Sequence, residues 1–174
     1  PGQVGAERHV GQGGERPREH RHRHAGCRER GARAGSMPED DEERQRVAGE
    51  AAEALWRGDA ASRQLGMTVE SCGPGRASVS MRIRPDMVNG HRICHGGLVF
   101  ALADSAFAYA CNSYGDNTVA AGAAIEFLAP GREGDTLLAV AVERWRAGRA
   151  GIYEIEVRNQ QGELVALFRG RSHQ

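Results

Sequence analysis

The stretch from Leu98 to Cys111 constrains the fold more than any other part of the chain. Of its 14 residues, 12 are apolar when alanine is counted, and only Asp104 and Ser105 interrupt it. Alanine is its commonest residue, which favours a helix over a strand. A helix that is apolar on every side must be buried. We therefore expect one long helix in the interior of the domain, with the other elements packed around it.

The segments on either side of this helix carry the patterns of a further helix and of β-strands. Acidic residues crowd the start of 39–57, where a helix dipole favours them, and apolar residues then recur at helical spacing. The stretch 76–84 alternates apolar and polar residues, as a half-buried strand does. The predicted strands are 64–71, 76–84, 118–128, 135–146, 152–158 and 163–171.

Two further features define the predicted sheet. The run 118–128 is almost continuously apolar, which is typical of a central strand. Short turns join the last four strands, which indicates an antiparallel meander. The sequence therefore predicts an α+β fold, in which a curved antiparallel sheet packs around one long buried helix and a short N-terminal helix precedes both.

Residues 1–36 differ in composition from the rest of the chain. They contain eight arginines and four glutamates, for a net charge of +4, and few apolar residues other than alanine. Such a segment cannot bury a core, so we expect it to be disordered. Because the first methionine is Met37, we interpret 1–36 as a basic extension that is non-native or upstream of the true start, and 37–174 as a single domain. Two alternatives are a basic tail that binds an acidic partner and a loose metal site on the histidines of 20–24.

The composition of the whole chain excludes several classes of protein. Its 23 basic residues balance 23 acidic ones, so there is no chain-wide positive field for nucleic acid. No run of 18 apolar residues predicts a transmembrane helix and no secretory signal is visible, so we expect a cytoplasmic protein. The four cysteines show no C-x-x-C spacing and predict neither a disulfide framework nor a zinc site. Because the chain lacks lysine, any phosphate must be bound by arginine, backbone N–H groups or a helix N-terminus.

Asp104 is the first candidate for catalytic chemistry. A carboxylate in the middle of an apolar helix is costly to bury in its ionised form. Carboxylates of this kind gather at functional sites, which makes Asp104 a candidate general base in a cleft. The alternative is a carboxylate that caps a neighbouring group or reaches solvent through a gap.

The start of the same helix is the second candidate, because Gly96 and Gly97 would let a ligand approach unpaired backbone N–H groups at the positive end of the helix dipole. Such a place suits a developing oxyanion. Gly97 and Asp104 are seven residues apart, which places them within about 20° on one helix face but about 10 Å apart along the axis. If both act on one bond, they must come from two antiparallel helices. We therefore expect a two-fold dimer, with Asp104 of each copy near Gly97 of the other.

Other chemistry in this region is less well supported. The pair Asn89-Gly90 is a strong turn signal. Ser105 could hydrogen-bond a substrate or cap locally, and no nucleophile-elbow motif accompanies it, which disfavours a serine hydrolase. A metal site is disfavoured because its potential ligands include a single cysteine and a carboxylate two turns inside the helix. These potential ligands are His91, Cys94, His95 and Asp104.

The motifs of 87–113 resemble those of a known family. They read Met-Val-Asn-Gly-His at 87–91, Cys-His-Gly-Gly at 94–97 and Phe-Ala-Leu-Ala-Asp-Ser-Ala-Phe-Ala-Tyr-Ala-Cys-Asn-Ser at 100–113. Further matching pieces are Phe127-Leu128, Pro130-Gly131, 134–137, 151–153 and 165–170. Together these motifs resemble the hotdog-fold thioesterases of the PaaI type, the phenylacetic acid degradation thioesterases, over about residues 45–173.

This resemblance implies a fold, an assembly and a reaction. The implied fold is a six-stranded antiparallel sheet wrapped around a long helix. The implied assembly is a homo-oligomer, either a dimer or a dimer of dimers (a homotetramer), with active sites at the subunit interfaces. The implied reaction is hydrolysis of acyl-CoA, with phenylacetyl-CoA and ring-hydroxylated aryl-acyl-CoA as substrates in phenylacetate degradation. Neither a metal nor an organic cofactor is implied. From the balanced charge and the lack of a long apolar run, we expect no nucleic acid or membrane partner.

The resemblance also assigns roles to single residues. Asp104 matches the acidic catalytic position, and Gly97 together with Gly96 matches the helix N-terminus that polarises the thioester carbonyl. Asp104 could activate a water molecule or attack the thioester to form a mixed anhydride, and the sequence favours neither route. The remaining matches are to polar positions that line the site, and they are Asn89, His95 and Ser105.

Two other functions are compatible with the same fold: an acyl-thioester hydratase and an acyl-CoA sensor without turnover. The hydratase would need an Asp/His pair in a different loop pattern, and a sensor has no use for a buried Asp104. Phe127 could shape an aryl pocket, whereas we expect Phe107 in the core. The arginines that could meet the phosphates of coenzyme A are Arg92, Arg132, Arg144, Arg146, Arg149 and Arg171.

Overall fold

A computed structural model of the chain describes residues 39–174, so the predictions for 1–36 and for a domain start at Met37 lie outside the described residues. The helices are α1 (Glu39–Gly58), α2 (Ala60–Gln64), the short 3-10 helix η1 (Pro85–Met87) and α3 (Gly96–Asn112). The strands are β1 (Met67–Gly73), β2 (Arg76–Arg82), β3 (Val119–Phe127), β4 (Thr136–Ala147), β5 (Ala150–Arg158) and β6 (Leu164–His173).

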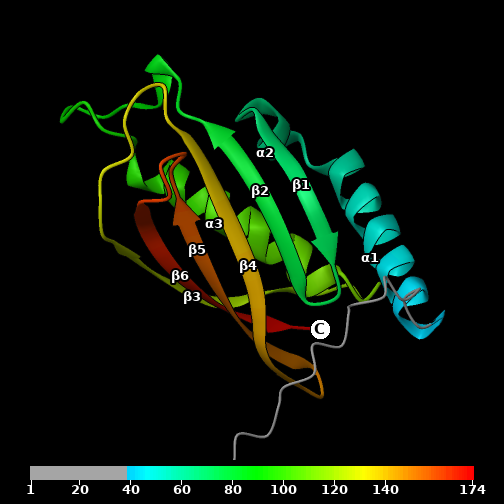
Figure 1. Ribbon diagram of the computed structural model, residues 1–174. Coiled ribbons are helices and arrows are strands. Elements are labelled where there is room, and N and C mark those ends of the chain that lie inside the picture. The colour runs from blue at the N-terminus through cyan, green and yellow to red at the C-terminus, as the bar shows by residue number, and fades with distance from the viewer. Residues whose placement is uncertain (1–38) are drawn as a thin grey trace, which may run out of the picture. The chain divides into compact units, whose positions relative to one another are not determined.

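All six strands belong to one antiparallel sheet in the order β1-β2-β4-β5-β6-β3. The sheet curves around α3, which lies along one of its faces, while α1 flanks the sheet beside β1 (Figure 1). The predicted α+β fold, a curved antiparallel sheet around one long helix with a helix before it, is confirmed.

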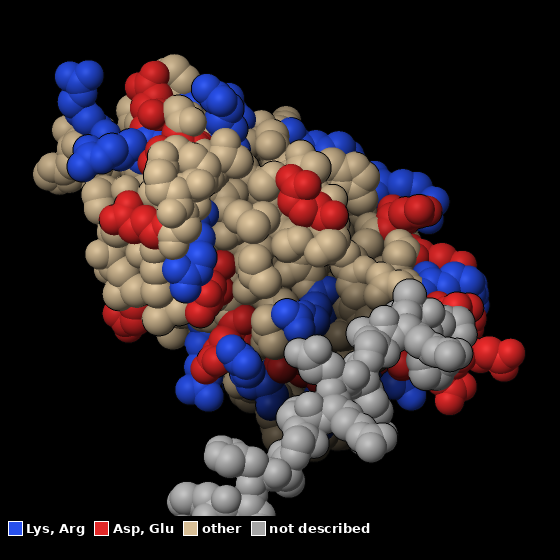
Figure 2. All heavy atoms as spheres, in the orientation of Figure 1, with Lys and Arg blue, Asp and Glu red and all other residues tan. Residues whose placement is uncertain are grey.

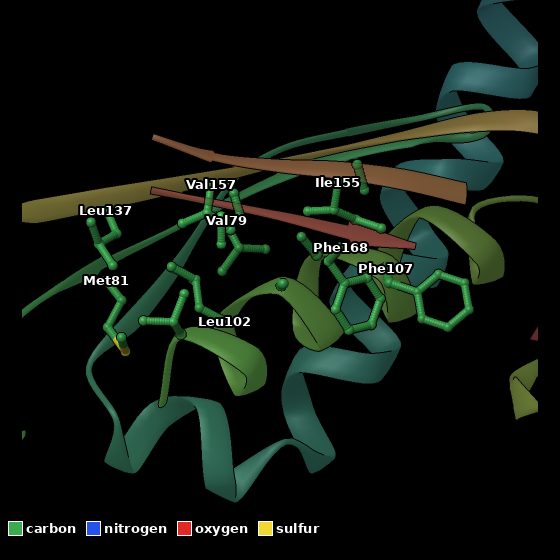
Figure 3. Close-up of a cluster of buried hydrophobic side chains, with 14 of the residues drawn as sticks. Val79, Met81, Leu102, Phe107, Leu137, Ile155, Val157 and Phe168 are labelled. Atoms are coloured by element: carbon green, nitrogen blue, oxygen red, sulfur yellow. The ribbon is translucent and has the colours of Figure 1, made fainter. Parts of the chain in front are cut away.

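The core lies between α3 and the inner face of the sheet (Figure 3). Rings from the helix and from two strands meet there: the centroid of Phe107 lies 5.3 Å from that of Tyr153 and 6.1 Å from that of Phe168. A Cβ atom at Gly170 would lie 3.0 Å from the ring of Phe107, so this position needs a glycine for the helix to approach β6. The expectation that Phe107 is a core residue is confirmed, because it is 1% exposed.

The position of β3 corrects the prediction for 118–128. Within residues 39–174 this strand pairs only with β6 and forms an edge of the sheet, and all of its residues except Ile125 are exposed. The meander therefore comprises β4, β5 and β6 alone. An apolar strand has the same sequence pattern whether its own chain or another molecule covers it, which is why the pattern wrongly predicted a central strand.

The short helix α2 is absent from the predicted elements. Asp59 caps it, since its carboxylate accepts a hydrogen bond from the N–H of Ser62 at 3.0 Å. The strand predicted at 64–71 consequently begins only at Met67. Ser62 is 3% exposed and connects α2 to α3.

The most apolar helix, α3, has 17 residues. Between residues 39 and 174, no helix combines the length and the hydropathy needed to cross a membrane.

Candidate active site

The start of α3 presents one occupied and one open backbone donor. His95 is the N-cap, with φ −61° and ψ 127°, and its Nδ1 atom accepts a hydrogen bond from the N–H of Gly97 at 3.1 Å. The N–H of Gly96 has no hydrogen-bond partner within residues 39–174. Because it also lies at the positive end of the helix dipole, the Gly96 N–H is the donor available to a developing oxyanion.

Backbone hydrogen bonds fix this end of the helix against two loops. The N–H of His95 donates to the carbonyl of Met87 at 2.9 Å, and the N–H of Cys94 donates to the carbonyl of Gly131 at 2.8 Å. The segment 88–95 is thus held against 128–135, and the open N–H of Gly96 is held with it.

Asn89 shapes the loop before the helix. Its side-chain Oδ1 accepts the N–H of His91 at 2.9 Å. Its backbone N–H donates to the carbonyl of Ile93 at 2.8 Å, and its carbonyl accepts the N–H of Arg92 at 2.9 Å. The prediction of a turn at Asn89-Gly90 is confirmed. The Nδ2 of Asn89 has no partner in the described part of the chain, so it can donate to a ligand.

A cavity of about 570 Å³ opens beside Gly96. The ring of Phe127 lies over this glycine, since a Cβ atom at Gly96 would be 3.1 Å from the Cζ of Phe127. Phe127 remains 54% exposed, because β3 is an edge strand. The cavity is lined mostly by apolar groups, from Asn89, Ile93, Cys94, Gly96, Val99, Phe127, Leu128, Ala129, Pro130, Gly131 and Val165.

Asp104 lies on α3 outside this cavity. Its side chain is half-buried, and burial raises the pKa of its carboxyl above the usual range. It makes no hydrogen bond and no ion pair with any residue between 39 and 174. A half-buried carboxylate without a partner is suited to accept a proton or to attack an electrophile.

Ser105, the next residue, has a partner inside the chain. Its hydroxyl lies 3.0 Å from that of Ser62 on α2, so the pair joins the two helices. Tyr109, one turn further along, donates to the carboxylate of Asp59 at 3.2 Å. The described structure therefore places Ser105 in a contact between α2 and α3.

The structure brings some of the predicted site residues together and separates others. Asn89 and Gly96 line one cavity, and His95 caps the helix at its edge. Asp104 and Ser105 lie about two turns further along α3. Within residues 39–174 no three His, Cys, Asp or Glu side chains gather as a metal site would require. The sequence did not predict that residues 128–131 form an apolar wall of the cavity. Their signals were the apolar run that continues into Leu128 and the match of Leu128 and Pro130-Gly131 to the family motifs.

Comparison with known proteins assigns a family to this arrangement. The model of the thioesterase superfamily matches residues 91–166. The acyl-coenzyme A thioesterase PaaI of Escherichia coli K12 is 50% identical over 122 residues, which cover 70% of this chain and 87% of that protein. The structure of E. coli PaaI, from the phenylacetic acid degradation operon, matches with a TM-score of 0.74 and 48% identity, over 75% of this chain and 94% of that one.

A second solved structure agrees. It is a mutant of the phenylacetic acid degradation protein PaaI from Thermus thermophilus, with a TM-score of 0.63 and 38% identity, over 65% of this chain and 96% of that one. The six-stranded sheet around α3 is the hotdog fold of these proteins. The chain therefore belongs to the PaaI-type hotdog-fold thioesterases and is an acyl-CoA thioesterase.

Proposed function

We propose that this enzyme hydrolyses aryl-acyl-CoA thioesters, with phenylacetyl-CoA and its ring-hydroxylated relatives as preferred substrates, in phenylacetate degradation. The similarity to PaaI proteins of phenylacetic acid degradation supports this substrate class. So does the cavity beside Gly96, which is largely apolar and has the ring of Phe127 at its edge. An aryl ring can stack against Phe127 in an offset or edge-to-face arrangement.

The observation that carries the catalytic part of the proposal is the separation of two groups along α3. The open N–H of Gly96 and the carboxylate of Asp104 belong to residues eight positions apart, a rise of about 12 Å. A thioester carbonyl bound at Gly96 is therefore out of reach of Asp104 on the same helix. We propose that Asp104 of a second copy completes each site, in a homo-oligomer with its active sites at the subunit interface.

Two surfaces of the chain support such a pairing. The edge strand β3 carries exposed apolar side chains, with Val119 62% exposed and Phe127 54% exposed, and a free strand edge is a template for pairing with another chain. On α3, the residues Gly97, Ala101, Asp104 and Ala108 form one stripe that the sheet leaves partly uncovered. Small residues there would let an antiparallel copy of the helix come close.

A dimer of dimers would use the other face of the sheet. Leu138 and Leu167 alternate with buried neighbours along β4 and β6 and point away from the core, where they are 38% and 41% exposed. A contact between two dimers would cover them. The proposed site needs only two copies of the chain, one that supplies Gly96 and one that supplies Asp104.

The proposed mechanism assigns each group one task. The N–H of Gly96 and the positive end of α3 polarise the thioester carbonyl and stabilise the oxyanion. His95 fixes the first turn by accepting the Gly97 N–H, and Asn89 donates its Nδ2 to the bound thioester or to the water. Asp104 of the other copy deprotonates the attacking water, or attacks the carbonyl itself to form an anhydride that water then cleaves. The thiolate of coenzyme A leaves in either route.

Thiol release from a panel of acyl-CoA substrates tests this proposal. The panel contains phenylacetyl-, hydroxyphenylacetyl-, benzoyl-, and short and long straight-chain acyl-CoA, and Asp104→Asn is assayed beside the wild type. We expect the highest kcat/KM with phenylacetyl and hydroxyphenylacetyl groups, and loss of thiol release from all substrates in the variant. A preference for straight chains would contradict the aryl proposal, and full activity of Asp104→Asn would contradict the assignment of the catalytic carboxylate.

A further inference from the structure

The loop that carries Asn89 is a small hairpin with three residues, 90–92, at its tip, and its two arms pair in antiparallel fashion. The N–H of Asn89 donates to the carbonyl of Ile93 at 2.8 Å, and the N–H of Arg92 donates to the carbonyl of Asn89 at 2.9 Å. A three-residue hairpin loop of this kind places its last residue in the left-handed conformation, which usually calls for glycine. In this chain the last residue of the loop is Arg92.

Arg92 does adopt the left-handed conformation. Its φ is 60°, and within residues 39–174 it is the one residue other than glycine with a positive φ. Gly90 belongs to the same loop, yet its φ is not positive. A residue with a Cβ atom is unfavourable in this conformation, and such outliers gather at functional sites. The loop is therefore strained at the one position where a glycine would relieve it.

The side chain of Arg92 does not account for this conformation. Its guanidinium group makes no hydrogen bond and no ion pair with any residue between 39 and 174, and the residue is exposed. Figure 2 shows basic side chains that project into solvent at the end of the molecule where this loop lies, at the upper left. The contacts that the loop makes around Arg92 come from its backbone, and they are made to Asn89.

The backbone of the loop holds the side-chain amide of Asn89. Its Oδ1 accepts the N–H of His91 at 2.9 Å, and the N–H of Ile93 donates to the same oxygen at 3.5 Å. The peptide that follows Arg92 carries the N–H of Ile93, so the backbone rotation at Arg92 sets the direction of this second donor. With Oδ1 engaged, Nδ2 is the group of the amide that remains for a ligand in the cavity that Asn89 lines.

We infer that Arg92 is a positioning residue, whose left-handed backbone holds the Asn89 amide so that Nδ2 is available to the reacting groups. This inference rests on the proposed function in that Nδ2 donates to the thioester or to the attacking water. The role needs a residue at position 92 that adopts a positive φ, and it does not need the guanidinium group. Because a misplaced donor weakens the transition state more than the binding of the whole substrate, the effect falls on kcat more than on KM.

Substitutions at position 92 test the inference, because they change the backbone preference while each removes the guanidinium group. Glycine favours the left-handed conformation, asparagine tolerates it, and valine opposes it because of its branched Cβ. We expect kcat of Arg92→Gly to exceed that of Arg92→Val about tenfold, with similar KM values and with Arg92→Asn close to Arg92→Gly. Equal kcat values in Arg92→Gly and Arg92→Val would overturn the inference.

An Asn89→Ala background shows whether the effect passes through Asn89. If position 92 acts by holding this amide, the difference between Arg92→Gly and Arg92→Val disappears once the amide is removed. A difference of about tenfold that persists in this background would overturn the inference, since position 92 would then act through another group.

Arg82→Val is the matched control for the chemical change. Arg82 is an exposed arginine on β2, where a valine is compatible with the extended backbone, and we expect the kcat of this variant to match the wild type. A loss in Arg82→Val as large as that in Arg92→Val would overturn the inference, because the effect would then not depend on the left-handed conformation.

Amide hydrogen exchange, measured by NMR, tests the loop without turnover. We expect the N–H of His91, which donates to Oδ1 of Asn89, to exchange faster in Arg92→Val than in Arg92→Gly, while the amides of α3 stay equally protected because the fold is intact. If the wild type cleaves no thioester, this result would support the positioning of Asn89 and only the proposed function would fail. Equal exchange of the His91 N–H in Arg92→Gly and Arg92→Val would overturn the inference with or without turnover.

Discussion

The Nδ1 atom of His95 accepts a hydrogen bond from the backbone N–H of Gly97 at 3.1 Å, and this contact determines which amide at the start of α3 is available. A helix leaves its first N–H groups without partners inside the helix. Here the N-cap satisfies the N–H of Gly97, and the N–H of Gly96 stays open beside the cavity. The catalytic donor is therefore proposed at Gly96, with Gly97 and His95 as the turn that holds it.

Replacement of His95 tests the capping contact. We expect His95→Ala to lower the free energy of unfolding by about 1 kcal/mol, because the N-cap acceptor is lost. His95→Asn supplies another N-cap acceptor and should lie closer to the wild type. Denaturant unfolding at one fixed protein concentration measures both, since assembly contributes to stability. Equal stability of His95→Ala and the wild type would show that the cap contributes nothing.

Two substitutions at Gly96 separate the N–H donor from the space around it. Gly96→Pro removes the N–H at the first helical position, where proline is well tolerated and where the extended backbone of His95 is compatible with a following proline. Gly96→Ala keeps the N–H and adds a Cβ atom 3.1 Å from the ring of Phe127. We expect kcat to fall about 10²- to 10³-fold in Gly96→Pro and only modestly in Gly96→Ala. Equal losses in the two variants would indicate crowding rather than loss of a donor.

Asp104→Asn is expected to lose activity and gain stability. As base or nucleophile, Asp104 must be ionised, so the wild-type kcat should fall as the pH falls through a pKa that burial raises above the usual range. The variant should lose about 10²- to 10⁴-fold in kcat at neutral pH.

The stability of the same variant provides a second readout. Because the pKa of Asp104 is higher in the folded than in the unfolded chain, the wild type binds more protons when folded, and its stability decreases as the pH rises through that interval. Asp104→Asn should therefore unfold at a higher temperature than the wild type at pH 7, and the difference should vanish at a pH below the unfolded pKa. A variant less stable than the wild type at pH 7 would contradict the burial cost.

Substitutions at Ser105 and Ser62 test whether the Ser105 hydroxyl has a structural role or binds the substrate. Its hydroxyl lies 3.0 Å from that of the buried Ser62, so either Ser105→Ala or Ser62→Ala leaves one hydroxyl without its partner. We expect each to lower the free energy of unfolding by about 1 kcal/mol, and the double variant to lose less than the sum. The kcat and KM of both single variants should match the wild type. A raised KM in Ser105→Ala alone would instead indicate contact with the substrate.

Much of the fold could be predicted from local pattern. The apolar, alanine-rich stretch beginning at Leu98 predicts α3, because a helix that is apolar on every side must be buried. The alternation in 76–84 predicts β2, because only one face of that strand packs on the core. The helix α2 could not be predicted this way, since its five residues span little more than one turn and depend on the cap at Asp59. Asp104 could be predicted as a functional residue because a carboxylate is unexpected in the middle of an otherwise apolar helix.

The remaining features depend on partners that a sequence does not identify. The apolar run of β3 predicts a buried strand, but the chain itself leaves β3 exposed at an edge of the sheet, and we propose that a second copy covers it. Similarly, two adjacent glycines at 96–97 look equivalent in sequence, and only the position of the His95 ring distinguishes their N–H groups. Which of the candidate arginines have partners likewise depends on the fold, which places carboxylates beside Arg144 and Arg146 and backbone carbonyls beside Arg149 and Arg171.

The most direct test of the central claim, that each active site combines Gly96 of one copy with Asp104 of another, is complementation in mixed oligomers. Gly96→Pro and Asp104→Asn chains with different tags are co-expressed, and oligomers that contain both are isolated by tandem purification. A shared site predicts that this mixed dimer recovers about half of the wild-type turnover, because one of its two sites is intact although both parents are inactive. A control dimer of wild type with the double variant should be inactive, since each of its sites has one defect. An inactive mixed dimer beside a half-active control would contradict the shared site and place Gly96 and Asp104 in the same chain's site.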